Sequence, residues 1–182
     1  MAAAADAVEV RLATASDAPL ASIASALILE ASADADIAPR EVEFLRTKIE
    51  TGRAAIALAG DDLVGFGYYS EWEDGKFVSH SGLVVRKDQQ GIGLGRRLKE
   101  QLFLASRERF PNAATMSLTT SKAVEQLNLS FGFQHAALDT LTTDPAFWAG
   151  CLPCKKYPEV QAAGKKCCCF GMLLPPEGSP EA

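Results

Sequence analysis

The feature that most constrains the fold is a glycine-rich segment between an apolar run and an amphipathic stretch. Residues 89–95 read Gln-Gln-Gly-Ile-Gly-Leu-Gly; they follow Leu83-Val84-Val85 and precede a stretch in which Leu98 and Leu102 recur at helical spacing. Glycine at every second position is unfavourable inside a helix or a strand, because glycine loses more backbone freedom on folding than any other residue. The segment is therefore predicted to be a loop that connects a strand to a helix.

Such a loop is suited to binding an anion. Where no Cβ blocks the approach, successive backbone N–H groups can converge on one point, and the following helix adds the positive end of its dipole. Arg96 or Arg97 can supply further charge. By itself the pattern is equally compatible with a turn that packs a helix close to a sheet. The spacing matches neither a P-loop, which ends in Gly-Lys-Ser/Thr, nor the Gly-x-Gly-x-x-Gly dinucleotide fingerprint.

The rest of the sequence indicates a mixed sheet with helices on both faces. The predicted order is strand, two helices, three antiparallel strands, helix, strand, helix, strand, and a run of strands followed by alternation is typical of such a sheet. Apolar periodicity and turn residues place strands at 8–12, 54–59, 63–69, 77–86, 115–118 and 133–141, and helices at about 17–29, 39–51, 96–110 and 121–131.

Composition narrows the class of protein. A chain of 182 residues suits one sizeable domain, and its net charge of −5 argues against a general nucleic-acid binder, which needs a basic face. The apolar stretch at 19–31 is too short to span a membrane, and the first ten residues carry no arginine or lysine, unlike a secretory or transit leader. We therefore expect a cytoplasmic protein, a monomer or a homodimer, with reduced cysteines.

Two motifs resemble a known family. Residues 83–95 are similar to the acetyl-coenzyme A signature of the GNAT N-acetyltransferases, Arg/Gln-x-x-Gly-x-Gly/Ala. The matching positions are Gln90, Gly93 and Gly95. Residues 129–133, Leu-Ser-Phe-Gly-Phe, resemble the second landmark of that family, a helix that ends in Gly-Phe before the next strand. The resemblance runs from about residue 8 to residue 141 and includes the predicted order of elements.

The resemblance implies a fold. It is the α/β (mixed α+β) acyl-CoA N-acyltransferase fold, with a mostly antiparallel sheet, helices on both faces and a splayed central pair of strands. Gly82 could mark the bulge that splays the strand at 77–86 from the strand at 115–118. Residues 1–143 would form the acetyltransferase domain, and residues 144–182, the cysteine tail, would form an extension that completes the sheet.

The resemblance also implies a site for acetyl-CoA. Loop amides would hold the pyrophosphate, the strand before the loop would bind the pantetheine arm through its main chain, and the amide near Val85 would polarise the thioester carbonyl. Ser121 replaces an Asn that often opens the later helix, and it could cap that helix or touch pantetheine. The cofactor-binding residues implied are Leu83, Val84, Val85, Gln90, Gly91, Ile92, Gly93, Leu94, Gly95, Arg96, Ser121 and Asn128.

The proton-transfer groups are less defined. Many members of the family place a Tyr where this chain has Asn128, so the usual acid for the departing thiolate is missing. Water, Tyr68 or Tyr69 could replace it. For the base that deprotonates the amine we favour His80, whose reference pKa near 6.5 suits the task, or Glu73 in the preceding turn, acting through water.

All five cysteines lie in the cysteine tail. Cys151-Leu152-Pro153-Cys154 and Cys167-Cys168-Cys169 give a Cys-x2-Cys and an available Cys-x-Cys, the donor set that a structural Zn²⁺ prefers. The predicted ligands are Cys151, Cys154, Cys167 and Cys169. The alternative is a final apolar strand at 168–174 in which cysteine is a small hydrophobic residue. Residues 147–151, Phe-Trp-Ala-Gly-Cys, resemble the tail of a bacterial subgroup of the family.

We therefore interpret the chain as an N-acetyltransferase that moves an acetyl group from acetyl-CoA to a primary amine of a small molecule by direct attack. An amino acid such as glutamate would need an arginine for its carboxylate, and Arg40, Arg46, Arg53 and Arg86 are candidates by residue type. A CoA-binding regulatory module and a zinc-stabilised interaction domain are the alternatives.

Overall fold

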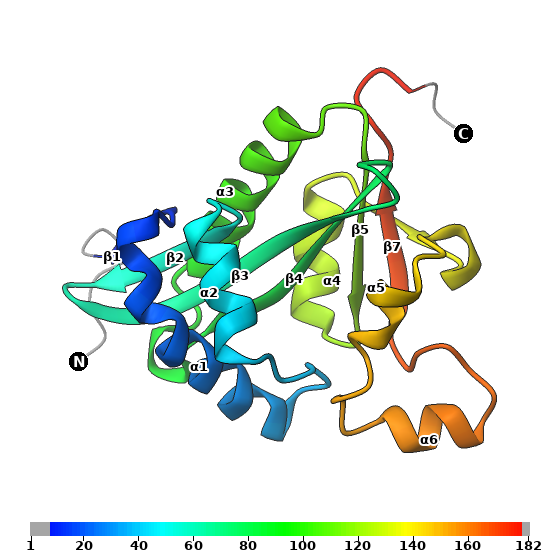
Figure 1. Ribbon diagram of the computed structural model, residues 1–182, viewed down its shortest axis with the longest axis horizontal. Coiled ribbons are helices and arrows are strands. Elements are labelled where there is room, and N and C mark those ends of the chain that lie inside the picture. Colours follow the sequence, from blue (N-terminus) through cyan, green and yellow to red (C-terminus); the bar gives the residue numbers. More distant parts are fainter. Residues whose placement is uncertain (1–7, 180–182) are drawn as a thin grey trace.

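The computed structural model describes residues 8–179 and shows a sheet of seven strands in the order β1-β2-β3-β4-β5-β7-β6. The pair β4–β5 is parallel, and the other pairs of described strands are antiparallel (Figure 1). The strands are β1 (Val8–Leu12), β2 (Ala54–Ala59), β3 (Asp62–Trp72), β4 (Phe77–Val85), β5 (Ala114–Thr119), β6 (Gln134–Ala136) and β7 (Phe170–Leu174). This confirms the predicted mixed fold. Of the first ten residues, from which the absence of a leader is predicted, residues 1–7 lie outside the described residues.

Helices cover both faces of the sheet. The α-helices are α1 (Ala21–Asp34), α2 (Val42–Glu50), α3 (Leu94–Arg109), α4 (Lys122–Ser130), α5 (Pro145–Ala149) and α6 (Tyr157–Ala162), and short 3-10 helices cover Ala15–Leu20, Lys87–Gln89 and Leu138–Thr140. Among the helices of residues 8–179, none combines the length and the apolar character that a membrane crossing requires.

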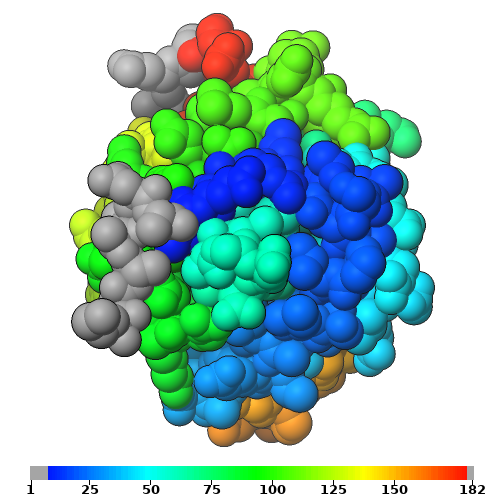
Figure 2. Space-filling view, turned by 90° about the vertical axis from the view of Figure 1, so that its left-hand side faces the viewer, coloured from blue at the N-terminus to red at the C-terminus, as the bar shows by residue number. Residues whose placement is uncertain are grey.

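Two apolar cores lie on opposite faces of the sheet. One joins α1 and α2 to the sheet through Ile28, Leu45 and Phe66, and the other joins α3 to the opposite face through Leu98 and Leu102. Figure 2 views the edge of this arrangement: the teal residues of the β2–β3 turn lie at the centre, beside blue residues from the N-terminal part of the chain. Because successive strand residues point to opposite faces, neighbouring residues of β3 enter different cores.

The strands β4 and β5 pair over a short length and then diverge. They are in register from Phe77–Ala114 to Ser79–Met116, after which the two strands separate, as Figure 1 shows. The β3–β4 register shifts opposite Gly82, which has φ +63°. This is a β-bulge, which bends a strand. The predicted bulge and the splayed central pair are therefore confirmed. Beyond Ser79, the edge of β4 that faces β5 has no partner strand among the described residues, whereas the opposite edge stays paired with β3.

The later part of the sheet differs from the prediction. The strand predicted at 133–141 is shorter: β6 ends at Ala136 and a 3-10 turn follows. The strand β7, from the cysteine tail, lies between β5 and β6 and pairs with both. Conversely, β3 extends to Trp72, beyond the predicted end at 69. Long-range pairing sets these boundaries, and local sequence patterns do not report it.

Candidate active site

A large cleft opens where β4 and β5 diverge. Its volume is about 920 Å³, and its walls come from the glycine loop, the free edge of β4, the β5–α4 connection, the α1–α2 loop and the cysteine tail. Of the predicted cofactor-binding residues, those that line the cleft are Leu83, Val84, Val85, Gln90, Gly91, Gly93, Leu94, Gly95 and Ser121. One cavity therefore collects residues that lie far apart in the sequence, from Ala31 to Cys169.

The glycine loop has the geometry expected of an anion-binding turn. Gly91 and Gly93 adopt φ values of +83° and +85°, and Gly93 is the N-cap of α3. A Cβ at Gly95 would meet no atom within 4 Å, so the space in front of the helix N-terminus is open. The Gln90 amide donates to the Val85 carbonyl at 2.9 Å and ties the loop to the end of β4.

Three predicted cofactor-binding residues do not line the cleft. Ile92 packs against the α3 core. Arg96 donates to the Ser130 hydroxyl at 2.9 Å and covers the Phe131 ring, so it belongs to the α3–α4 contact beside the loop. Asn128 is fully buried, with its amide 3.5 Å from the Met172 sulfur. Asn128 does not line the cleft because this side of α4 faces β7, a contact that local sequence patterns do not contain.

Ser121 caps the helix α4, which is the first of the two roles predicted for it. It is the N-cap of α4, and its hydroxyl accepts a bond from the Val124 amide at 3.4 Å. Because the residue also lines the cleft, capping leaves it beside the region where the arm of a cofactor would pass.

His80 lies at the closed end of the cleft. It is the first β4 residue beyond the paired segment, and its Nε2 lies 2.9 Å from the Ser106 hydroxyl. Its Nδ1 is buried and has no hydrogen-bond partner in the described part of the chain. Burial holds the pKa of His80 well below its usual value, and the charges of Lys99 and Arg107 act in the same direction. His80 is therefore neutral at pH 7.

Glu73 does not reach the cleft. It lies in the β3–β4 turn with φ +50°, and its carboxylate accepts bonds from the Thr142 hydroxyl at 2.6 Å and the Thr143 amide at 2.8 Å. The hydrogen bond from Thr142, followed by that from Thr143, lowers the pKa of Glu73 and makes it a weak base. Glu73 anchors the segment that leads into the cysteine tail, and its role as a base stays a prediction.

The two adjacent tyrosines separate onto opposite faces. Tyr69 is buried in the α3 core and does not line the cleft, and its catalytic role stays a prediction. Tyr68 points to the other face and lines the cleft, where its hydroxyl accepts a bond from Arg40 Nε at 2.8 Å. Sequence adjacency could not distinguish them, since the direction of each side chain depends on the strand register.

Of the four candidate arginines, Arg40 lines the cleft. Its Nη1 donates to the Gly150 carbonyl at 3.0 Å and so ties the α1–α2 loop to the cysteine tail. Its Nη2 forms no hydrogen bond with any described residue. The other three are engaged elsewhere: Arg46 with Ala18 and Glu43, Arg53 with Glu71, and Arg86 with Asp88.

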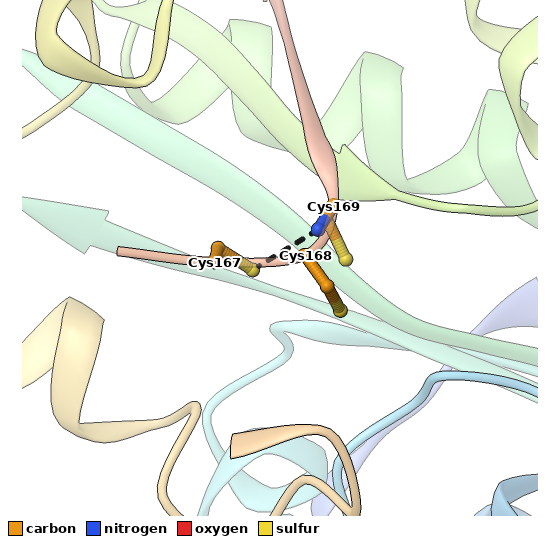
Figure 3. Close-up of side chains that lie close together, drawn as sticks. All are labelled: Cys167, Cys168 and Cys169. Atoms are coloured by element: carbon orange, nitrogen blue, oxygen red, sulfur yellow. Dashed lines mark hydrogen bonds between the residues drawn. The ribbon is translucent and has the colours of Figure 1, made fainter. Parts of the chain in front are cut away.

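The cysteine tail forms part of the wall beside Arg40. The sulfur atoms of Cys167, Cys168 and Cys169 lie within 4.8 Å of one another, just before β7 (Figure 3). The Cys167 thiol also hydrogen-bonds with Cys151; this bond lowers the pKa of Cys167 and raises that of Cys151. The two cysteine motifs therefore meet in space, and all five cysteines are free thiols.

Sequence patterns did not single out Lys99. It lies on α3, is 2% exposed and lines the cleft near His80. Its ammonium group lies 4.6 Å from the centre of the Phe133 ring. A buried lysine in an amphipathic helix carries no sequence signal, because most lysines of such helices face water.

The sequence profile of the Acetyltransferase (GNAT) family matches residues 21–133. This covers more than half of the chain, and the chain belongs to that family. No curated protein sequence matches the chain.

Solved structures of acetyltransferases share the fold. N-acetylglutamate synthase from Neisseria gonorrhoeae, complexed with coenzyme A and N-acetyl-glutamate, is 20% identical with a TM-score of 0.65 over 92% of this chain, which spans 35% of that protein. Ribosomal-protein-alanine N-acetyltransferase from Brucella melitensis is 20% identical with a TM-score of 0.64, covering 92% and 99% of the two chains. Diaminobutyrate acetyltransferase from Paenibacillus lautus, with its substrate and coenzyme A, is 10% identical with a TM-score of 0.65, covering 96% and 98%. At these identities the likeness shows the fold alone.

Proposed function

We propose that the protein transfers an acetyl group from acetyl-CoA to a primary amine of a small molecule. The observation that carries this proposal is that the glycine loop and the unpaired edge of β4 open into the same cleft. The first supplies N–H donors at a helix N-terminus for a pyrophosphate, and the second supplies main-chain groups for an extended amide-containing arm. Family membership and the acetyltransferase structures that share the fold support the same reading.

The chemistry would consist mainly of positioning. The acetyl thioester would lie between β4 and β5, where an N–H of β4 can polarise its carbonyl, and the neutral amine would attack directly. Of the predicted proton-transfer residues, His80 remains a candidate because it lines the cleft with a free Nδ1. Its lowered pKa makes it a weak base, so a water molecule between it and the amine would carry the proton.

Isothermal titration of acetyl-CoA tests the cofactor site. Gly95→Trp would fill the open space before α3 without the strain that a positive φ would impose. We expect micromolar binding to the wild type and its loss in Gly95→Trp. Leu104→Trp, on the exposed side of the same helix, is the matched control. Equal binding by wild type and Gly95→Trp would sink the cofactor assignment. Binding without turnover on a panel of amines would favour a regulatory module.

We further propose an amino acid as the acceptor. Arg40 Nη2 is available in the cleft while Nε and Nη1 are held by Tyr68 and Gly150, an orientation suited to a carboxylate. The test compares amino acids with their decarboxylated amines. The wild type should prefer the amino acid, and Arg40→Met should lose that preference. An unchanged preference in Arg40→Met would exclude this role for Arg40.

The cysteine tail is proposed to hold one structural Zn²⁺. The proposal is supported by the sulfur atoms of Cys167, Cys168 and Cys169, which lie within 4.8 Å of one another, and by the interaction of Cys151 with Cys167. Thiolates at Zn–S distances of about 2.3 Å are ordinary zinc ligands. Cys151, Cys154, Cys167 and Cys169 would hold the ion. Its role would be to fix the tail against the cleft, with no part in acetyl transfer.

Elemental analysis of the purified chain tests the metal site. We expect about one zinc per chain in the wild type and in Cys168→Ser, as a structural four-thiolate site requires, and little in Cys154→Ser. Retention of zinc by Cys154→Ser, or a wild type purified from zinc-supplemented medium without metal, would contradict the assignment.

A further inference from the structure

Lys99 is a buried cation without a counter-ion. It is 2% exposed, and within the described residues its ammonium group forms neither a hydrogen bond nor an ion pair. The ammonium group lies over the face of the Phe133 ring, 4.6 Å from its centre. An unpaired buried charge is costly, and the cation–π contact offsets part of that cost. The position therefore suggests a negative partner that arrives with a ligand.

The cleft determines where that partner would lie. Lys99 and His80 both line the cleft and both pack around Phe133, next to the point where β4–β5 pairing ends at Ser79–Met116. This is the closed end of the slot between the strands. An arm that enters from the glycine loop and follows the free edge of β4 would place its far end here.

The surroundings of Lys99 are otherwise cationic or neutral. His80 faces it from β4, and Arg107, on the same helix, points to the Ala113 and Pro175 carbonyls. Phe133 covers it from the segment before β6. Burial lowers the pKa of Lys99 to about 7. The group can therefore both carry a proton and release it near neutral pH.

We propose that Lys99 binds the sulfur atom of CoA and is the acid that protonates the departing thiolate. The proposal rests on the proposed acetyl-CoA site. It also supplies the group missing at Asn128, which faces β7 and cannot reach the slot.

The step balances without another reactant. The amine nitrogen bonds to the carbonyl carbon, and the C–S bond then breaks with its electron pair on sulfur. The Lys99 ammonium gives a proton to sulfur and yields the CoA thiol, while the amine nitrogen loses a proton to water. Neutral Lys99 regains a proton from water before the next cycle.

The experiment measures the pKa of the CoA thiol when it is bound, from the far-ultraviolet absorbance of the thiolate as pH is varied. Desulfo-CoA, which lacks the thiol, provides the baseline. The variants are Lys99→Met and, as a matched control, Lys48→Met. Lys48 is a buried lysine that does not line the cleft, and its ammonium group lies over the rings of Phe44 and Tyr68.

In the wild type we expect the bound thiol to ionise at least one pH unit below an ordinary thiol, whose pKa is about 8.5. Lys99→Met should abolish the shift and weaken CoA binding about tenfold per lost pKa unit, while desulfo-CoA binding stays unchanged. Lys48→Met should behave as the wild type. An equal thiol pKa in wild type and Lys99→Met, or equal weakening of both ligands, would overturn the role of Lys99. Failure of the wild type to bind either ligand would instead overturn the CoA site itself, and this inference with it.

Discussion

At the scale of single residues, Gly82 links backbone conformation to the opening of the cleft. Its φ is +63°, and a Cβ at this position would lie 2.5 Å from a ring carbon of Tyr68. We expect Gly82→Ala to lower the free energy of unfolding by about 2 kcal/mol, because a non-glycine residue is strained at positive φ and the ring must also move. Urea denaturation measures the change. In the double variant Gly82→Ala/Tyr68→Ala, the part of this destabilisation that comes from the clash should be absent. If the unfolding free-energy changes of the two single variants simply add, the contact is contradicted.

Asp17 is the residue from which a pH dependence of stability follows. Its carboxylate accepts two bonds from Arg11, at 2.7 and 2.9 Å, and one from the Thr14 amide at 2.8 Å. The hydrogen bond from Arg11 and then those from Thr14 hold the pKa of Asp17 well below its usual value. The ionised group therefore stabilises the fold above the unfolded pKa of about 3.9, and this contribution is lost as the pH falls below it.

Urea denaturation of Asp17→Asn across pH tests this linkage. The wild type should be more stable than Asp17→Asn at pH 6–8, and the difference should shrink as the pH falls through and below about 4. A difference that is constant from pH 8 to pH 3 would show that Asp17 contributes by shape and not by charge.

At the scale of elements, β7 depends on a close approach of backbones. A Cβ at Gly171 would lie 2.8 Å from the Ala136 carbonyl oxygen of β6 and 3.1 Å from a methyl group of Leu141. Gly171→Ala should therefore destabilise the protein by about 1–3 kcal/mol, the usual range for overpacking. Thermal unfolding measures this effect. Gly95→Ala, in the first turn of α3 with no atom within 4 Å, should instead be neutral or slightly stabilising; equal effects of the two variants would argue against the steric explanation.

The elements also show what local patterns predict well. Strands β1 and β2 and the end of α3 match their predicted bounds closely, since alternation or helical spacing is strong there. The predicted strand at 133–141 ends early because β6 can pair only as far as Gly171 of β7. Local periodicity does not contain that limit.

At the scale of the whole molecule, the cysteine tail is part of the sheet. β7 lies between β5 and β6, with pairings such as Ser117–Met172 and His135–Met172. The predicted division at residue 143 stays a prediction about domains. The topology nevertheless indicates that a chain of residues 1–143 would lack β7, the strand that pairs with both β5 and β6, and would expose the edge of β5.

A truncation tests this dependence. We expect a chain that ends at Thr143 to be insoluble or to lack a cooperative thermal transition, whereas a chain that ends at Ser179 should unfold as the full-length protein does. Circular dichroism with thermal melting distinguishes them. A soluble, cooperative protein of residues 1–143 would show that the acetyltransferase core is independent of β7.

The sequence by itself determined the mixed α/β class and the glycine loop, because these depend on local spacing and on backbone conformations that only certain residues adopt. Tertiary structure decided the rest. Strand register separated Tyr68 from Tyr69, the insertion of β7 turned Asn128 away from the cleft, and hydrogen bonding made Glu73 an anchor. The same packing brought Arg40 and Lys99 to the cleft, since contacts between residues distant in the chain determine which charged side chains leave water.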